Sequence, residues 1–187
     1  MERLRKVAIA VLAVFCLTCR ATERKPQSMG GQSREGEVRM IEPRNSLVDF
    51  REDKDAPKPP DVGIAIALLP ASKPLKFSVG QPIVLHGAYQ ADLNLIRLCP
   101  AGMSGSVMMT LIRTDRPWGE TARLITPQMA PSLDRVPKGT DDPTYREVEQ
   151  FRVDLVKFFR LPKEPGKYSI EAALGPHFSG RISFAIE

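Results

Sequence analysis

The sequence predicts an all-β fold, a Greek-key β-sandwich of seven to nine strands, on three observations. Apolar and polar residues alternate in many short runs after residue 61, as they do in strands with one buried face. No segment keeps a long apolar stripe of period 3.6, which an amphipathic helix would require. The run from Leu161 through Pro165 and Gly166 to Tyr168 has the spacing of a tyrosine corner. In that motif the ring fills the core of a sandwich and the hydroxyl bonds to upstream backbone.

Period-two alternation and turn residues define the expected strands in chain order. The strand 62–69 is typical, because Ile64, Ile66 and Leu68 share one face. A Gly-Gln-Pro turn separates the second strand from the third, and a Pro-Gly turn opens the strand that holds Tyr168. The strands are expected at 62–69, 75–79, 83–89, 94–98, 106–113, 122–126, 149–158, 168–174 and 181–187.

Two stretches are less regular. Residues 146–159 alternate from Phe151 on and end in a Leu-Pro corner, which favours a strand, although four apolar residues there could also share a helix face. Residues 114–145 are rich in Pro and hold the only Trp. We expect this second stretch to be a long loop, and loops of such length are usually functional or disordered.

Two phrases of the sequence are typical of strands in sandwich domains. The first is 77–85, where V-G-x-P-I-x-L opens a strand, and the second leads from 151–155 through the Leu-Pro corner into the final hairpin. In both phrases the chain resembles bacterial extracytoplasmic immunoglobulin-like domains. The resemblance implies an immunoglobulin-like sandwich and no particular function. The chain departs from antibody-type domains because it lacks their two core cysteines and has Trp118 in a predicted loop.

Residues 1–21 predict a secretory signal peptide. Arg3, Arg5 and Lys6 precede an unbroken apolar run at 7–17, which is shorter than the roughly 20 residues of a membrane span. Cleavage after Ala21 or after Cys19 fits the pattern, and an uncleaved anchor or a buried helix is the alternative. A lipid on Cys19 is a weaker alternative, because lipoprotein signals have a small residue before the lipidated cysteine and Thr18 is only a marginal match to it. We therefore expect an exported protein: periplasmic, envelope-associated or secreted.

Residues 22–61 are expected to form a disordered linker ahead of a domain at 62–187. Charged residues, Gly, Pro and Ser dominate the linker, so it has little apolar surface to offset the loss of chain entropy on folding. A short docked piece around 40–50 is the alternative.

Charge and cysteine content exclude some classes of function. Removal of the signal peptide would lower the formal net charge from +5 to +2, and no basic cluster with interleaved aromatic residues remains, so nucleic acid is not an expected partner. Cys99 would be the only cysteine left, which excludes an internal disulfide. Buried filler is the expected role of Cys99, and a reactive or intermolecular thiol is the alternative.

Catalytic and metal-binding patterns are weak. His86 is expected to be a half-buried structural residue in a strand, and His177 an exposed residue at a hairpin tip. Two distant histidines and one cysteine do not make a zinc motif. The acidic residues of the loop before Tyr145 are read as a solvated face rather than a calcium site. We predict no catalytic residue and no cofactor.

A binding role is the hypothesis that remains. Trp118 is the best contact candidate, followed by Arg116 and His177, since exposed aromatic and Arg side chains often anchor partners. Tyr168, Gly166 and Leu161 are expected to be structural. The first hypothesis is a non-catalytic module that binds a protein or envelope component. A secreted inhibitor that presents the 114–145 loop is the second, and a hydrolase with a loop-assembled site is the third.

Overall fold

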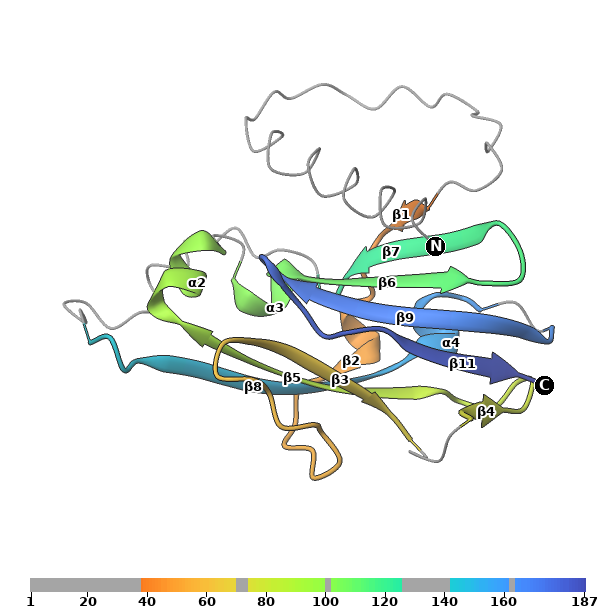
Figure 1. The fold of residues 1–187 in the computed structure, drawn as a ribbon, viewed down its shortest axis with the longest axis horizontal. Coiled ribbons are helices and arrows are strands. Elements are labelled where there is room, and N and C mark those ends of the chain that lie inside the picture. The colour runs from red at the N-terminus through yellow and green to blue at the C-terminus, as the bar shows by residue number, and fades with distance from the viewer. Residues whose placement is uncertain (1–37, 70–73, 100–101, 126–141, 162–163) are drawn as a thin grey trace, which may run out of the picture. The chain divides into compact units, whose positions relative to one another are not determined.

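The computed structural model describes residues 38–69, 74–99, 102–125, 142–161 and 164–187, which form two β-sheets (Figure 1). In the larger sheet the strand order is β1-β7-β6-β9-β11-β4, with β10 beside β9. Its strands are β1 (Arg39–Ile41), β4 (Lys76–Phe77), β6 (Val107–Arg113), β7 (Trp118–Arg123), β9 (Gly166–Leu174), β10 (His177–Phe178) and β11 (Ile182–Ile186).

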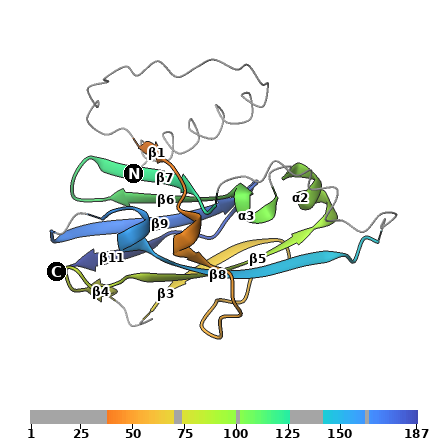
Figure 2. The same ribbon diagram turned by 180° about the vertical axis from the view of Figure 1, so that it is seen from behind.

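The smaller sheet has the order β2-β8-β5-β3. Its strands are β2 (Val48–Asp49), β3 (Gly63–Leu68), β5 (Val84–Asp92) and β8 (Arg146–Asp154). The two sheets lie as two layers in both views (Figures 1 and 2). Short helical turns join the strands: η1 (Asn45–Leu47), α2 (Leu93–Leu98), α3 (Met103–Ser106) and α4 (Leu155–Phe158). The all-β prediction is confirmed at this level, and none of these helices is long and apolar enough to span a membrane.

Residues from both sheets fill one core, as the alternating patterns predict. Along β9, the side chains of Tyr168, Ile170, Ala172 and Leu174 are all fully buried. Alternate residues of β3 and β6 face the same core, while the residues between them are partly exposed. Period-two burial therefore sets which face of each strand packs inward.

The ends of several elements differ from the predictions. Residues 94–98 form helix α2 rather than a strand, because the Asp92 carboxylate accepts a hydrogen bond from the Leu95 amide (2.8 Å) and caps a helical turn. The expected strand 149–158 ends at residue 154 and continues as the helix α4. The expected strand 122–126 begins earlier, at Trp118, since residues 118–123 pair with β6 as β7.

The described part of the predicted linker, residues 38–61, contains two short strands. Strand β1 pairs with β7 and β2 pairs with β8, so residues 38–49 extend both sheets. Ile41, Leu47, Val48 and Phe50 pack against the core, which supplies the apolar burial that composition alone did not indicate. The docked-piece alternative describes this segment. Residues 1–37, with the predicted signal peptide, lie outside the described residues.

A glycine at the centre of the smaller sheet makes room for an aromatic ring. Gly87 of β5 lies opposite Phe151 of β8 in the strand register. A Cβ at Gly87 would lie 2.2 Å from the Phe151 Cζ atom, well inside van der Waals contact. Phe151 is fully buried, so its ring has little room to move aside.

We predict that Gly87→Ala lowers the free energy of unfolding by about 3 kcal/mol, because the added methyl group overpacks the core. Urea denaturation measures this change. The double variant Gly87→Ala/Phe151→Leu should lose less than the sum of the two single variants, because the smaller side chain leaves space for the methyl group. Strict additivity would contradict the contact.

Candidate functional site

The residues that join β2 to β3 cross the outer face of the smaller sheet. We call residues 50–62 the strap. Because β2 and β3 lie at opposite edges of this sheet, the strap must span roughly 14 Å and pass over β8 and β5 on its way. It contacts both strands: the Asp53 amide donates to Gln150 Oε1 of β8 (2.8 Å), and Gln90 of β5 donates to the Asp61 carbonyl (2.8 Å). The strap therefore covers a face that would otherwise meet solvent.

A buried acid–imidazole pair lies under the strap. Asp53 Oδ2 and His86 Nδ1 are 2.6 Å apart, and the two residues are 9% and 6% exposed. His86 points outward from β5, because Leu85 and Tyr89 on either side of it belong to the core. The strap thus explains why an outward-facing histidine is buried. The prediction of a structural histidine did not include this partner.

The environment of Asp53 favours its charged form. Burial raises the pKa of the Asp53 carboxyl, but hydrogen bonds from His86 and from the Asp55 amide outweigh burial, so this pKa lies below its ordinary value. The Ala56 amide also donates to the Asp53 carbonyl (3.0 Å), which closes a tight turn. The turn brings the Asp55 carboxyl back toward the pair.

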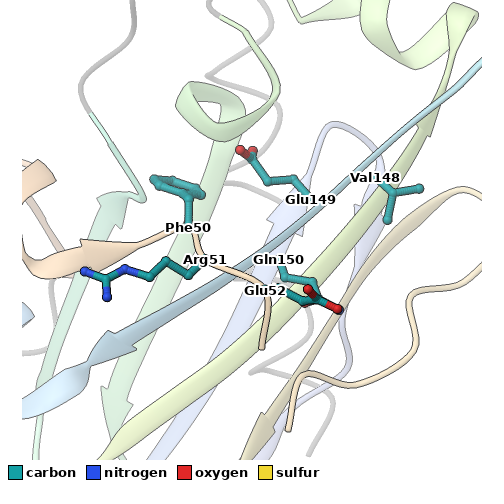
Figure 3. A pocket seen from close by; sticks show the side chains of 6 residues that line it. All are labelled: Phe50, Arg51, Glu52, Val148, Glu149 and Gln150. Atoms are coloured by element: carbon teal, nitrogen blue, oxygen red, sulfur yellow. The ribbon is translucent and has the colours of Figure 1, made fainter. Parts of the chain in front are cut away.

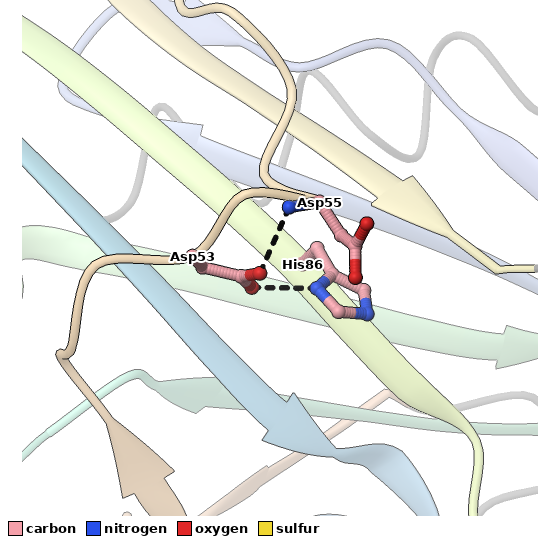
Figure 4. A group of neighbouring side chains, drawn as sticks. All are labelled: Asp53, Asp55 and His86. Atoms are coloured by element: carbon pink, nitrogen blue, oxygen red, sulfur yellow. Dashed lines mark hydrogen bonds and ion pairs between the residues drawn. The ribbon is translucent and has the colours of Figure 1, made fainter.

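Asp53, Asp55 and His86 make a mixed oxygen and nitrogen donor set (Figure 4). One donor atom from each residue lies within 4.8 Å of the other two, and Asp55 is exposed. Such a set can hold a divalent cation, or orient an imidazole as a general base. In the described ranges, no serine, threonine or cysteine side chain hydrogen-bonds to His86. The one signal of this set in the sequence is the Asp-x-Asp spacing of Asp53 and Asp55, which lies in the segment expected to be a linker.

A hollow of about 300 Å³ lies between the start of the strap and β8 (Figure 3). Its lining residues are Phe50, Arg51, Glu52, Val148, Glu149 and Gln150. Glu149 also accepts hydrogen bonds from the buried Tyr89 hydroxyl and from Ser104 Oγ (3.0 Å). Burial, together with the Glu149 charge, raises the pKa of Tyr89, which keeps its hydroxyl protonated as a donor. None of the described residues that line the hollow is a histidine or a cysteine.

The three predicted contact residues do not form one surface. Trp118 lies in β7, partly buried, with its ring edge-on to Tyr168 at a centroid distance of 6.2 Å. Arg116 is exposed and pairs with Glu164 (3.3 Å). His177 lies in β10, beside Leu174 at the other end of β9. Six residues of strand, roughly 20 Å, separate Tyr168 from Leu174, so His177 is remote from the other two. Residues 126–141 of the expected loop lie outside the described residues.

The tyrosine corner is present only in part. The Tyr168 ring is fully buried and stacks on Phe184, with centroids 5.5 Å apart. However, its hydroxyl makes no hydrogen bond within the described part of the chain, so the expected bond to upstream backbone is wrong there. Instead, the Arg113 guanidinium lies 5.6 Å from the ring centroid. Leu161, 5% exposed, packs in the core as expected.

Arg113 stabilises the corner in place of that missing bond. It is 7% exposed and donates to Asp115 Oδ1 (2.7 Å), Glu164 Oε1 (2.6 Å) and the Pro165 carbonyl (2.6 Å). Gly166 is required beside it, since a Cβ there would lie 2.8 Å from Arg113 Nε. The hydrogen bond from Arg113 holds the pKa of the Asp115 carboxyl below its usual value.

The ion pair between Arg113 and Asp115 should make the stability of the protein depend on pH. Because the pKa of Asp115 is lower in the folded state, its contribution is complete above the unfolded pKa of about 3.9 and is lost as the pH falls through the folded pKa. We expect Asp115→Asn to flatten the decline in the free energy of unfolding between about pH 5 and pH 2. Urea denaturation across this range measures it. In an Arg113→Met background, Asp115→Asn should have little further effect, and an equal effect in both backgrounds would contradict the pairing.

Comparison with protein-family models, with curated proteins and with solved structures gave no match to this chain. Function is therefore argued from the geometry above.

Proposed function

We propose that the protein is an exported, non-catalytic binding module with an immunoglobulin-like fold, which binds a protein of the cell envelope by strand addition at β3. The N-terminal basic and apolar residues support export, because they have the pattern of a signal peptide. The fold and the binding mode each have separate support.

The strand order supports the immunoglobulin-like assignment. In such domains one sheet contains strands A, B and E, and the other contains G, F, C and C′. Here β3, β5 and β8 would correspond to A, B and E, and β11, β9, β6 and β7 to G, F, C and C′. The connections from β5 to β6 and from β8 to β9 cross between sheets, as Greek-key links do.

The edge strand β3 carries the binding proposal. It ends the smaller sheet and has the sequence GIAIAL, with no charged residue and no proline. Exposed edges are usually protected by charges, proline or short length. The other terminal strands of the two sheets follow that rule, since each has two or three residues, one of them charged: Arg39 in β1, Asp49 in β2 and Lys76 in β4. Strand β3 is six residues long and has no charge and no proline, so its composition does not protect it. At its first residue, Gly63, His177 of β10 and Pro60 lie close by, so the proposed binding edge is the rest of the strand.

The side chains of β3 suit an incoming strand. Ile64, Ile66 and Leu68 are buried in the core, so the strand is held firmly in register. Ala65 and Ala67 point outward and are only partly buried. Small side chains at these two positions leave space for a neighbouring strand, whose backbone would pair with the outer backbone groups of β3, which pair with no other strand among the described residues. A partner segment with alternating apolar residues fits this edge.

A metal-assisted or general-base hydrolase is the second candidate. The observation that favours it is the carboxylate-oriented imidazole of His86, described above. It ranks second because the described residues place no nucleophile in contact with that ring.

The binding proposal is tested with lysine substitutions on the edge strand. We expect the Ala65→Lys/Ala67→Lys variant to lose at least about tenfold in the recovery of envelope proteins on the immobilised chain, because an added strand would have to desolvate both charges. Quantitative proteomics of the bound fraction measures this recovery. Ser183→Lys, an exposed position of β11, is the matched control and should bind as the unmodified chain does.

Two further results decide between contact surfaces. If both lysine variants fold and recover each protein equally, strand addition at β3 is excluded. If Trp118→Ala alone abolishes recovery, the partner binds at the β6–β7 end instead, and the β3 proposal fails.

A further inference from the structure

The donor set beneath the strap has the composition of a transition-metal site rather than of a solvated acidic cluster. It combines two carboxylates with one imidazole, and zinc and related divalent ions favour imidazole nitrogen, whereas calcium and magnesium favour oxygen alone. Two of the three residues, Asp53 and His86, are more than nine-tenths buried. A buried pair loses little further solvation when it binds a cation.

The ligands are fixed by neighbouring elements before any ion binds. His86 lies in the centre of β5, which pairs with β3 on one side and β8 on the other. The Asp53 amide donates a hydrogen bond to the Gln150 side chain, and the Asp53 carboxylate accepts one from the Asp55 amide. Bonds of 2.0–2.2 Å require donor atoms roughly 3.0–3.5 Å apart. Donor atoms within 4.8 Å of one another would have to approach by at most about 1.3–1.8 Å, and Asp53 Oδ2 and His86 Nδ1, now 2.6 Å apart, would have to separate slightly.

The Asp55 carboxylate and the Nε2 atom of His86 have no protein partner in the described ranges. The Asp55 carboxylate, two residues from Asp53, makes no hydrogen bond or ion pair there and is free to rotate toward an ion. His86 is bonded only through Nδ1; Figure 4 shows its Nε2 on the far side of the ring from Asp53. Among the described residues, Nε2 is not one of the buried side-chain atoms that lack a partner, so water can reach it. The ring can therefore carry its proton on Nε2 and present Nδ1 to an ion.

Local charge favours a divalent ion. Asp53 and Asp55 supply two negative charges when ionised. Arg152 lies opposite His86 in the register, but its guanidinium donates to Asp49 Oδ2 (2.8 Å) rather than to Asp53. Its field lowers the Asp53 pKa only as the last of several causes. Arg152 therefore does not occupy the position of a cation between the two carboxylates.

We propose that Asp53, Asp55 and His86 bind one zinc-like divalent ion, which replaces the proton between Asp53 and His86 Nδ1 and fastens the strap to β5. The imidazole presents its Nδ1 lone pair and holds its remaining proton on Nε2. Asp53 and Asp55 contribute one oxygen each, and water completes the coordination on the open side. This inference does not depend on strand addition at β3.

The test uses the full chain with Zn²⁺ and with Co²⁺, whose absorption reports its ligands. Titration calorimetry should give one site, and Zn²⁺ at about 100 times its dissociation constant should raise the melting temperature by roughly 5–10 °C. Asp55→Asn should weaken binding at least tenfold and leave the metal-free melting temperature unchanged, because Asp55 is exposed and unpaired. His86→Gln should also abolish the metal-dependent increase in melting temperature.

Asp142→Asn is the matched control. Asp142 is an exposed aspartate in a similar turn, where its Oδ1 accepts from the Thr144 amide (2.8 Å), and it lies outside the site. This variant should bind as the unmodified chain does. The proposal is overturned if neither ion binds at millimolar concentration, or if Asp55→Asn and Asp142→Asn behave alike. An intense sulfur-to-cobalt absorption would assign the ion to cysteines and would overturn it as well.

Discussion

The buried contact between Asp53 and His86 joins the strap to β5, an inner strand of the smaller sheet. An outward-facing imidazole at the centre of a sheet is normally solvated, and covering it without a partner would cost more than the strap could offset. The carboxylate of Asp53 supplies that partner, and its own burial is balanced by hydrogen bonds from His86 and from the Asp55 amide. The strap can therefore cross from β2 to β3 and seal one face of the sheet.

This crossing also links the site to the edge strand. The strap runs directly into β3, and Gln90 of β5 fixes the last part of it through the Asp61 carbonyl. Anything that holds the strap, whether the acid–imidazole pair alone or an ion bound to it, also holds the start of the strand at which we propose binding. The core side of β3 is independent of the strap, since its isoleucines pack among residues of both sheets.

Sequence patterns predicted what depends on neighbours along the chain. Alternation gave the inward faces of β3, β6 and β9, because side-chain direction in a strand follows from local geometry. It missed the helix α2, where the Asp92 cap outweighed a short apolar run, and it placed Trp118 in a loop. The pairing of Asp53 with His86, 33 positions apart, depends on tertiary packing that composition does not encode. The same holds for Arg113, whose partner Glu164 is 51 positions away.

The most direct test of this account is hydrogen exchange at the amides of Asp53 and Asp55, which the structure bonds to Gln150 and Asp53. In the unmodified chain we expect both to exchange much more slowly than in a free peptide. In an Asp53→Ala variant, the strap should exchange freely while β5 and β8 keep their protection. Strap amides that already exchange at the free-peptide rate in the unmodified chain would contradict the account, because residues 50–62 would then be a linker after all.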